Sequence, residues 1–161
     1  MSQVALFVRL PTNSISALRK AAKPTKWFFG APKDNYWKFL NATGGHAAEY
    51  EWSGWTMIVL LSCLQDTYQI DLLASSQDDL AKFLTDTRGT THVVLTQELK
   101  DACLDRLNPA NFTLDELRDA YNAFEEADEP EAGRPMLDGV KALHDALSAV
   151  DDSSVVLLIV G

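Results

Sequence analysis

The chain has 161 residues, an apolar share of 47%, a charged share of 23% and a formal net charge of −9. These values are ordinary for a soluble globular protein. A domain of this length buries roughly 70% of the surface that its unfolded chain exposes. The longest apolar run, 155–160, is far shorter than the ~20 residues of a membrane-spanning helix. We therefore predict a single globular domain over residues 1–161 with no membrane partner.

The charge of the chain is unevenly distributed. Residues 1–40 carry seven Lys or Arg against one acidic residue, a net of +6, whereas residues 41–161 carry seven against 22, a net of −15. A surface of one sign attracts partners of the opposite sign and repels those of its own. The distribution therefore bears on what the chain binds, and the acidic part argues against a nucleic-acid partner.

The first half of the chain predicts one strand and several helices. Residues 3–10 are rich in β-forming residues, which is typical of a strand that a proline ends. An amphipathic helix follows and ends before Pro24, and residues 34–40 predict one or two helical turns. The most apolar helix, 52–64, has Ser53 as its predicted cap. Because it is apolar on almost every side, we expect this helix at the centre of the domain.

The next elements alternate between helix and strand. The pattern predicts a helix at 78–84, a strand at 91–95 and a further helix that Thr96 caps. The clearest start signal is formed by Thr113 and Glu116, which have the spacing of a capping box. In this motif each side chain accepts a hydrogen bond from the backbone N–H of the other residue, so a helix is predicted to begin there.

The end of the chain predicts how the sheet is built. Residues 125–135 are acidic, contain Pro and Gly and predict a loop. An amphipathic helix follows at 136–150, and 155–160 is an unbroken apolar run. A strand without polar alternation is covered on both faces, so we expect it to be central in its sheet. The predicted class is α+β, with a small mixed sheet that includes the N- and C-terminal strands and packs against a helix-rich middle.

The residue types that most often carry catalysis or bind metals form no recognisable pattern. Cys63 and Cys103 lie in apolar helical patterns without Cys-x-x-Cys spacing, which predicts buried, reduced thiols and a cytoplasmic location. His46, His92 and His144 lack the spacing of metal ligands, and a zinc site needs three or four converging ligands. We therefore assign no catalytic residue, no metal site and no cofactor.

Two pairs of residues near the central helix are candidates for binding. In an extended segment the side chains of Glu49 and Glu51 point the same way, and mutual repulsion would raise one pKa. The interpretation that we favour is a solvated approach to the helix start. Trp52 and Trp55 lie three residues apart and could form the floor of a pocket. For this pair we favour a place in the core.

The basic segment 19–39 contains aromatic residues among its lysines, including Trp27 and Trp37. Such a segment could bind single-stranded nucleic acid, but no recognised motif accompanies it. Its lysines could instead pair with the protein's own acidic helices, where each exposed pair adds at most about 1 kcal/mol. A third interpretation is an aromatic docking surface for a protein partner. These alternatives stay open.

The pattern of residues 95–107, followed by 112–121 and by the terminal 155–161 (Val-Val-Leu-Leu-Ile-Val-Gly), resembles the YfbM-like family of uncharacterised bacterial proteins. The opening strand and first helix, and the helix from Trp52, are also similar. Members of that family often carry a histidine a few residues after the central tryptophan, whereas Trp55 is followed here by Thr-Met-Ile-Val. The resemblance implies a small α+β fold and no assigned activity.

Three functional hypotheses follow. The first is a non-enzymatic binding protein, such as an acidic inhibitor or immunity-type protein that binds a basic protein partner. The second is a small-molecule binder or enzyme with a pocket near the Trp52/Trp55 helix, to which His46 contributes with the two glutamates. The third is nucleic-acid binding through 20–38. We predict the first, with no nucleic-acid partner and no assigned oligomeric state. The candidate binding residues are Glu49, Glu51, Trp52, Trp55, Trp27 and Trp37.

Overall fold

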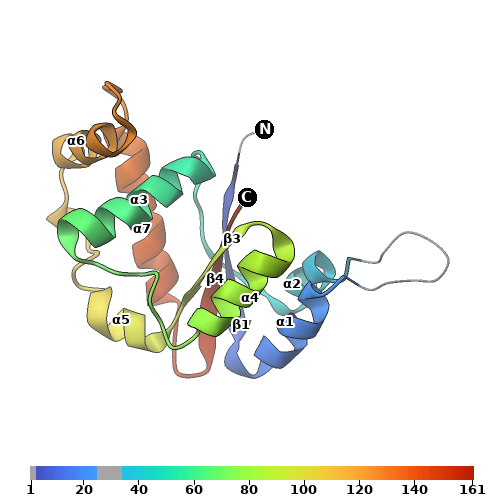
Figure 1. Ribbon diagram of the computed structural model, residues 1–161. Helices are drawn as coiled ribbons and strands as arrows, with labels where there is room; N and C mark the ends of the chain where they lie inside the picture. The colour runs from blue at the N-terminus through green and yellow to red at the C-terminus, as the bar shows by residue number, and fades with distance from the viewer. Residues whose placement is uncertain (1–2, 25–33) are drawn as a thin grey trace.

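A four-stranded sheet divides the protein into two helical halves (Figure 1). The computed structural model describes residues 3–24 and 34–161. The strands, in the order β2-β1-β4-β3 across the sheet, are β1 (Ala5–Pro11), β2 (Gly45–Ala48), β3 (Thr91–Leu95) and β4 (Ser154–Val160). The predicted α+β class and the inclusion of the first and last strands are confirmed. All the described pairings are antiparallel, so the sheet is antiparallel rather than mixed.

Helices cover both faces of the sheet, as the two sides of Figure 1 show. One face carries α1 (Ile15–Ala22), α2 (Tyr36–Thr43) and α4 (Asp78–Arg88). The other carries α3 (Gly54–Tyr68), α5 (Gln97–Cys103), α6 (Leu114–Glu125) and α7 (Gly133–Ser148). Short 3-10 turns lie at Thr12–Ser14 and Pro109–Asn111. No helix in the described part of the chain has the length and apolar character needed to cross a membrane.

β4 is the central strand, as its unbroken apolar sequence predicts. It pairs with β1 on one side and β3 on the other, and all seven of its residues are buried. Alternate side chains serve different cores, because successive residues of a strand point to opposite faces. Val156, Leu158 and Val160 pack against the α3/α7 side, and Val155, Leu157 and Ile159 pack against the α1/α2/α4 side.

The predicted helix starts are confirmed at three positions. The Ser53 side chain accepts from the backbone N–H of Trp55 at 3.2 Å, and Thr96 accepts from that of Leu99. The Thr113–Glu116 capping box is formed in both directions, with distances of 3.2 and 3.4 Å. Each cap satisfies an N–H that has no partner within its own helix.

Several predicted features differ in the structure. β2 was not predicted from its sequence, Gly-His-Ala-Ala, because these residues have little β propensity and the strand exists through its pairing with β1. The predicted loop 125–135 contains the last residue of α6 and the first turn of α7. Ala102 and Phe124, which the helical spacing places on buried faces, are exposed.

The start of α7 lies very close to the start of α6. A Cβ atom on Gly133 would overlap the carbonyl oxygen of Leu114 and would lie 3.1 Å from its carbonyl carbon and 3.3 Å from its Cα. These neighbours are backbone atoms, which cannot rotate away. The absence of a side chain at this position therefore sets the separation of the two helices.

Candidate functional site

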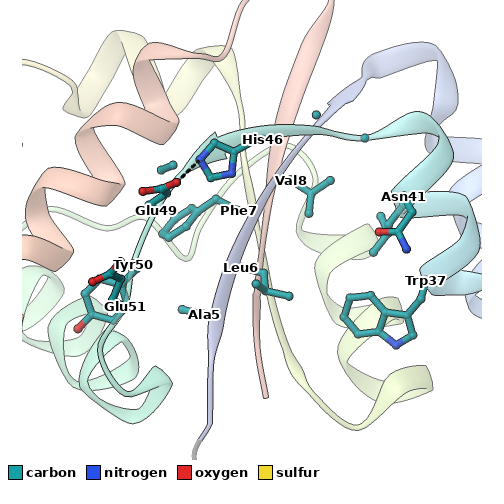
Figure 2. Close-up of a pocket in the computed structure, with 14 residues that line it drawn as sticks. Ala5, Leu6, Phe7, Val8, Trp37, Asn41, His46, Glu49, Tyr50 and Glu51 are labelled. Carbon is teal, nitrogen blue, oxygen red and sulfur yellow. Dashed lines mark ion pairs between the residues drawn. The ribbon is translucent and has the colours of Figure 1, made fainter.

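An open groove of about 490 Å³ lies along β1, between α2 and the segment that follows β2 (Figure 2). Leu6 and Val8 point toward α2, where Trp37 and Asn41 form one wall. The opposite wall is formed by residues 48–51. Two large apolar side chains that line this groove, those of Leu6 and Trp37, are exposed, so part of its apolar wall is covered by no described residue.

The path of the chain after β2 produces the second wall. β2 pairs with β1 only from Phe7 to Arg9, and the register shifts between Phe7 and Val8. The chain then leaves the edge of β1 and returns at Gly54, whose N–H donates to the carbonyl of Gln3 at 2.9 Å. The intervening residues are free to point their polar side chains toward solvent.

Three of the predicted binding residues, Trp37, Glu49 and Glu51, line this groove. His46, which was expected to contribute to a pocket with the two glutamates, lines it as well. The imidazole Nε2 of His46 lies 3.7 Å from the Glu49 carboxylate, and the Glu49 side chain is 80% exposed. Glu51 is also exposed. The two carboxylates therefore lie in solvent beside the approach to α3, which is the interpretation that the sequence favoured over a catalytic pair.

Trp52 and Trp55 are not core residues, so the prediction that placed them there is wrong. Their exposed fractions are 44% and 45%. Trp52 precedes α3, so the pair does not share a helical face. The buried side of α3 is filled by smaller side chains, namely those of Met57, Leu60, Leu61 and Leu64. An indole also carries an N–H that needs a partner, which the apolar core does not offer.

Each of these two indoles is fixed by a carboxylate from a different helix. Trp52 Nε1 donates to Asp138 of α7 at 3.0 Å, and Trp55 Nε1 donates to Glu125 of α6 at 3.1 Å. The exposed Glu129 and Glu131 line a shallow hollow that also includes Thr56 of α3, the residue after Trp55. We call this region, formed by Trp52, Trp55, Glu125, Glu129, Glu131 and Asp138, the Trp–carboxylate surface.

Asp138 is the most strongly held carboxylate of the Trp–carboxylate surface. Partial burial opposes its ionisation, but the hydrogen bonds from Trp52 and Arg134 and the positive charges of Arg134 and Lys141 outweigh burial and lower its pKa. Arg134 lies 3.2 Å and Lys141 3.7 Å from its two oxygens. Asp138 therefore stays ionised and accepts the indole hydrogen bond throughout the neutral range. Sequence patterns did not identify it, because its partner Trp52 is 86 residues away.

The basic–aromatic segment is described only in part. Trp27 lies outside the described residues. In the described part, Lys20, Lys23 and Lys38 form no ion pair, so the proposed pairing with the protein's own acidic helices is not seen for them. Lys23 lies 5.8 Å from the centre of the Phe83 ring instead.

The two thiols are free and buried, as predicted. Burial raises the pKa of both Cys63 and Cys103, which disfavours the reactive thiolate form. Among residues 3–24 and 34–161 no group of three or more His, Cys, Asp or Glu side chains is arranged to hold a metal ion.

The site therefore has two parts, the groove and the Trp–carboxylate surface, joined through residues 49–51, which border Trp52 and Asp138 as well as the groove. Comparison of the chain with protein-family models, with curated proteins and with solved structures found no match.

Proposed function

We propose that this protein is a non-enzymatic binding protein whose Trp–carboxylate surface takes a basic protein partner, as an acidic inhibitor or immunity-type protein does. The observation that carries this proposal is the pair of exposed indoles held by carboxylates of α6 and α7. The hydrogen bonds fix the rings before a partner arrives, so little side-chain entropy is lost on binding. Tryptophan is among the residues most enriched where binding energy is concentrated.

The charge around these rings supports a basic partner. The connection between α6 and α7 carries four exposed acidic residues, Glu126, Asp128, Glu129 and Glu131. Carboxylates that surround an aromatic anchor accelerate association with a cationic surface and make the rate sensitive to salt. Lys or Arg side chains of the partner can also lie over the indole faces, which the N–H hydrogen bonds leave open.

Three further proposals accompany this function. A cytoplasmic location is supported by the two buried free thiols, since reducing compartments keep cysteines unpaired. Relationship to the YfbM-like family is supported by the sequence pattern alone. A protein partner rather than nucleic acid is supported by the net charge of −15 over residues 41–161.

The test is affinity capture with three baits, followed by reconstitution. The baits are the wild type, a Trp52→Ala/Trp55→Ala double variant, and Leu73→Ala, which truncates an exposed apolar residue away from this surface. Proteins captured at low salt are quantified by mass spectrometry, and those lost only with the double variant are purified and titrated against the wild type. We expect a basic protein whose association rate falls steeply with added salt. An identical set of captured proteins for all three baits, or an affinity indifferent to salt, would contradict the proposal.

The groove supports a second candidate, a small-molecule binder. Glu49 and Glu51 line it together with Trp37, and none of the described residues that line it is Lys or Arg. An apolar wall next to two carboxylates suits an organic cation with an aromatic or aliphatic body. Phenethylamine and the matched anion 3-phenylpropionate are suitable probes for NMR shift mapping. Shifts at Trp37 that appear only with the amine and are lost in Glu49→Gln/Glu51→Gln would support this candidate, and equal responses to both probes would exclude it.

A further inference from the structure

A hydrogen-bonded pair of titratable side chains is buried between α2 and the sheet. Tyr36 is 1% exposed and His92 is 4% exposed. The Tyr36 hydroxyl lies 2.6 Å from Nε2 of His92, although the residues are 56 positions apart. Their rings also meet edge to face, with centroids 5.9 Å apart. Tyr36 is the first residue of α2, so this contact attaches the start of that helix to β3.

The hydrogen bonds define the protonation state of His92. Nδ1 lies 2.9 Å from the carbonyl oxygen of Thr90, which can only accept, so Nδ1 carries the proton. Nε2 of the neutral ring then accepts from the Tyr36 hydroxyl. Both nitrogens of the neutral imidazole are satisfied. A second proton on Nε2 would take away the acceptor of a buried O–H.

The surrounding charges oppose a proton on His92. The guanidinium of Arg88, on α4, lies over the Tyr36 ring at 4.6 Å from its centre. Burial lowers the pKa of His92, and the Arg88 charge lowers it further, against the effect of the Thr90 carbonyl. Ile159, which pairs with His92 across the sheet, is apolar and offers no charge to balance a protonated imidazole. Among the described residues no carboxylate is bonded to the imidazole.

Asp34 is the acidic residue that contacts Tyr36, whose backbone N–H donates to its carboxylate at 3.0 Å, and it is already bound to Arg88. Its carboxylate accepts from Arg88 at 2.5 Å, and that hydrogen bond is the main cause of its lowered pKa. Arg88 also donates to the carbonyl of Ala22, at the end of α1. Asp34 thus stays ionised in mild acid and remains bound to Arg88, so it does not compensate a charge on His92.

We propose that protonation of His92 detaches α2 from the sheet, so that mild acid changes the shape of the groove. α2 has eight residues, and only Tyr36 and Leu40 among them are buried. Few buried side chains hold α2 against the sheet, so it can separate locally when the buried pair is charged. Trp37 and Asn41 of the same helix form a wall of the groove and must move with it. Histidine protonation of this kind is a common basis for pH-dependent interfaces. The inference depends on neither the partner nor a ligand.

Amide hydrogen exchange measures this opening directly. Protection of the α2 amides, 36–43, is compared with that of the α7 amides at about pH 7.5 and about pH 5, after correction for the intrinsic exchange rates. In the wild type we expect the protection factors of the α2 amides to fall at least about tenfold at the lower pH, while those of the α7 amides stay unchanged. A tenfold change corresponds to a difference of about one unit between the pKa of His92 in the closed state and its pKa in the opened state. NMR titration of the three histidines gives the pH at which His92 takes up its proton.

Two variants make the result decisive. His92→Gln removes the titrating group and keeps an acceptor for Tyr36, so its α2 protection should not depend on pH. The control is His46→Asn/His144→Asn, which removes the other two histidines and should behave as the wild type. The proposal is overturned if α2 keeps its protection while His92 titrates, if the control loses the effect, or if all helices lose protection together. If His92→Gln does not fold, coincidence of the α2 opening with the wild-type His92 titration decides the question.

Discussion

Substitution of Gly133 by alanine should destabilise the protein, although alanine favours helices. The gain in helix propensity is at most about 1 kcal/mol. Against it stands the overlap of the new Cβ with the Leu114 carbonyl group, at 3.1 Å from the carbonyl carbon. Relief requires α6 and α7 to move apart, which disturbs the buried contacts of Leu117 and Met136. Such overpacking costs about 1–3 kcal/mol, and more where only backbone can yield.

We expect Gly133→Ala to lower the free energy of unfolding by roughly 2 kcal/mol, which lowers the Tm of a domain of this size by about 4–8 °C. Urea unfolding followed by circular dichroism, with calorimetry for Tm, measures both values. Gly45→Ala is the matched control, because a Cβ at that position meets nothing within 4 Å, and it should stay within about 0.5 kcal/mol of the wild type. A Gly133→Ala protein as stable as the wild type would refute the argument from close helix approach.

Three other predictions concern stability. Thr113→Ala should lower the free energy of unfolding by about 1 kcal/mol through loss of the capping box, measured by urea unfolding. Gly54→Ala should lower it by about 1–3 kcal/mol, because its Cβ would lie 2.8 Å from Val160 and 3.0 Å from the Val4 backbone; a stabilised variant would contradict this packing. Hydrogen bonds from the backbone N–H of Ser153 and from nearby serine hydroxyls lower the pKa of Asp151 to about 2. The ionised Asp151 therefore stabilises the fold fully above pH 3.8, the ordinary pKa of an aspartate, and this stabilisation is lost as the pH falls toward 2. The urea midpoint of Asp151→Asn should not show this loss between pH 3.8 and 2.

The sequence predicted those parts of the fold that depend on local chemistry. The capping box at Thr113 and the central position of 155–160 both follow from adjacent residues and are confirmed. β2 could not be predicted in this way, since residues 45–48 have little intrinsic preference for a strand and adopt one only against β1.

The candidate site was predictable only in part. Trp37, Glu49 and Glu51 were singled out by residue type, and the structure places all three at one groove. Trp52 and Trp55 were predicted to be buried because aromatic residues at helical spacing usually are. They are exposed instead, and their indoles donate to carboxylates of distant helices, which the residue pattern of a single element does not show. The Tyr36–His92 pair joins α2 to β3 and was missed for the same reason.

The central position of β4 constrains how the protein folds during synthesis. β4 is the last of the four strands to leave the ribosome, yet it lies between β1 and β3, which do not pair with each other. β1 and β2 can pair early, but β3 cannot join them until β4 is available, and both hydrophobic cores lack the seven residues of β4 until then. Long-range pairing of this kind slows folding and leaves unpaired strand edges exposed until it is complete. A nascent chain that stops before Ser154 should consequently need protection from aggregation, and the two halves should fold in one cooperative step.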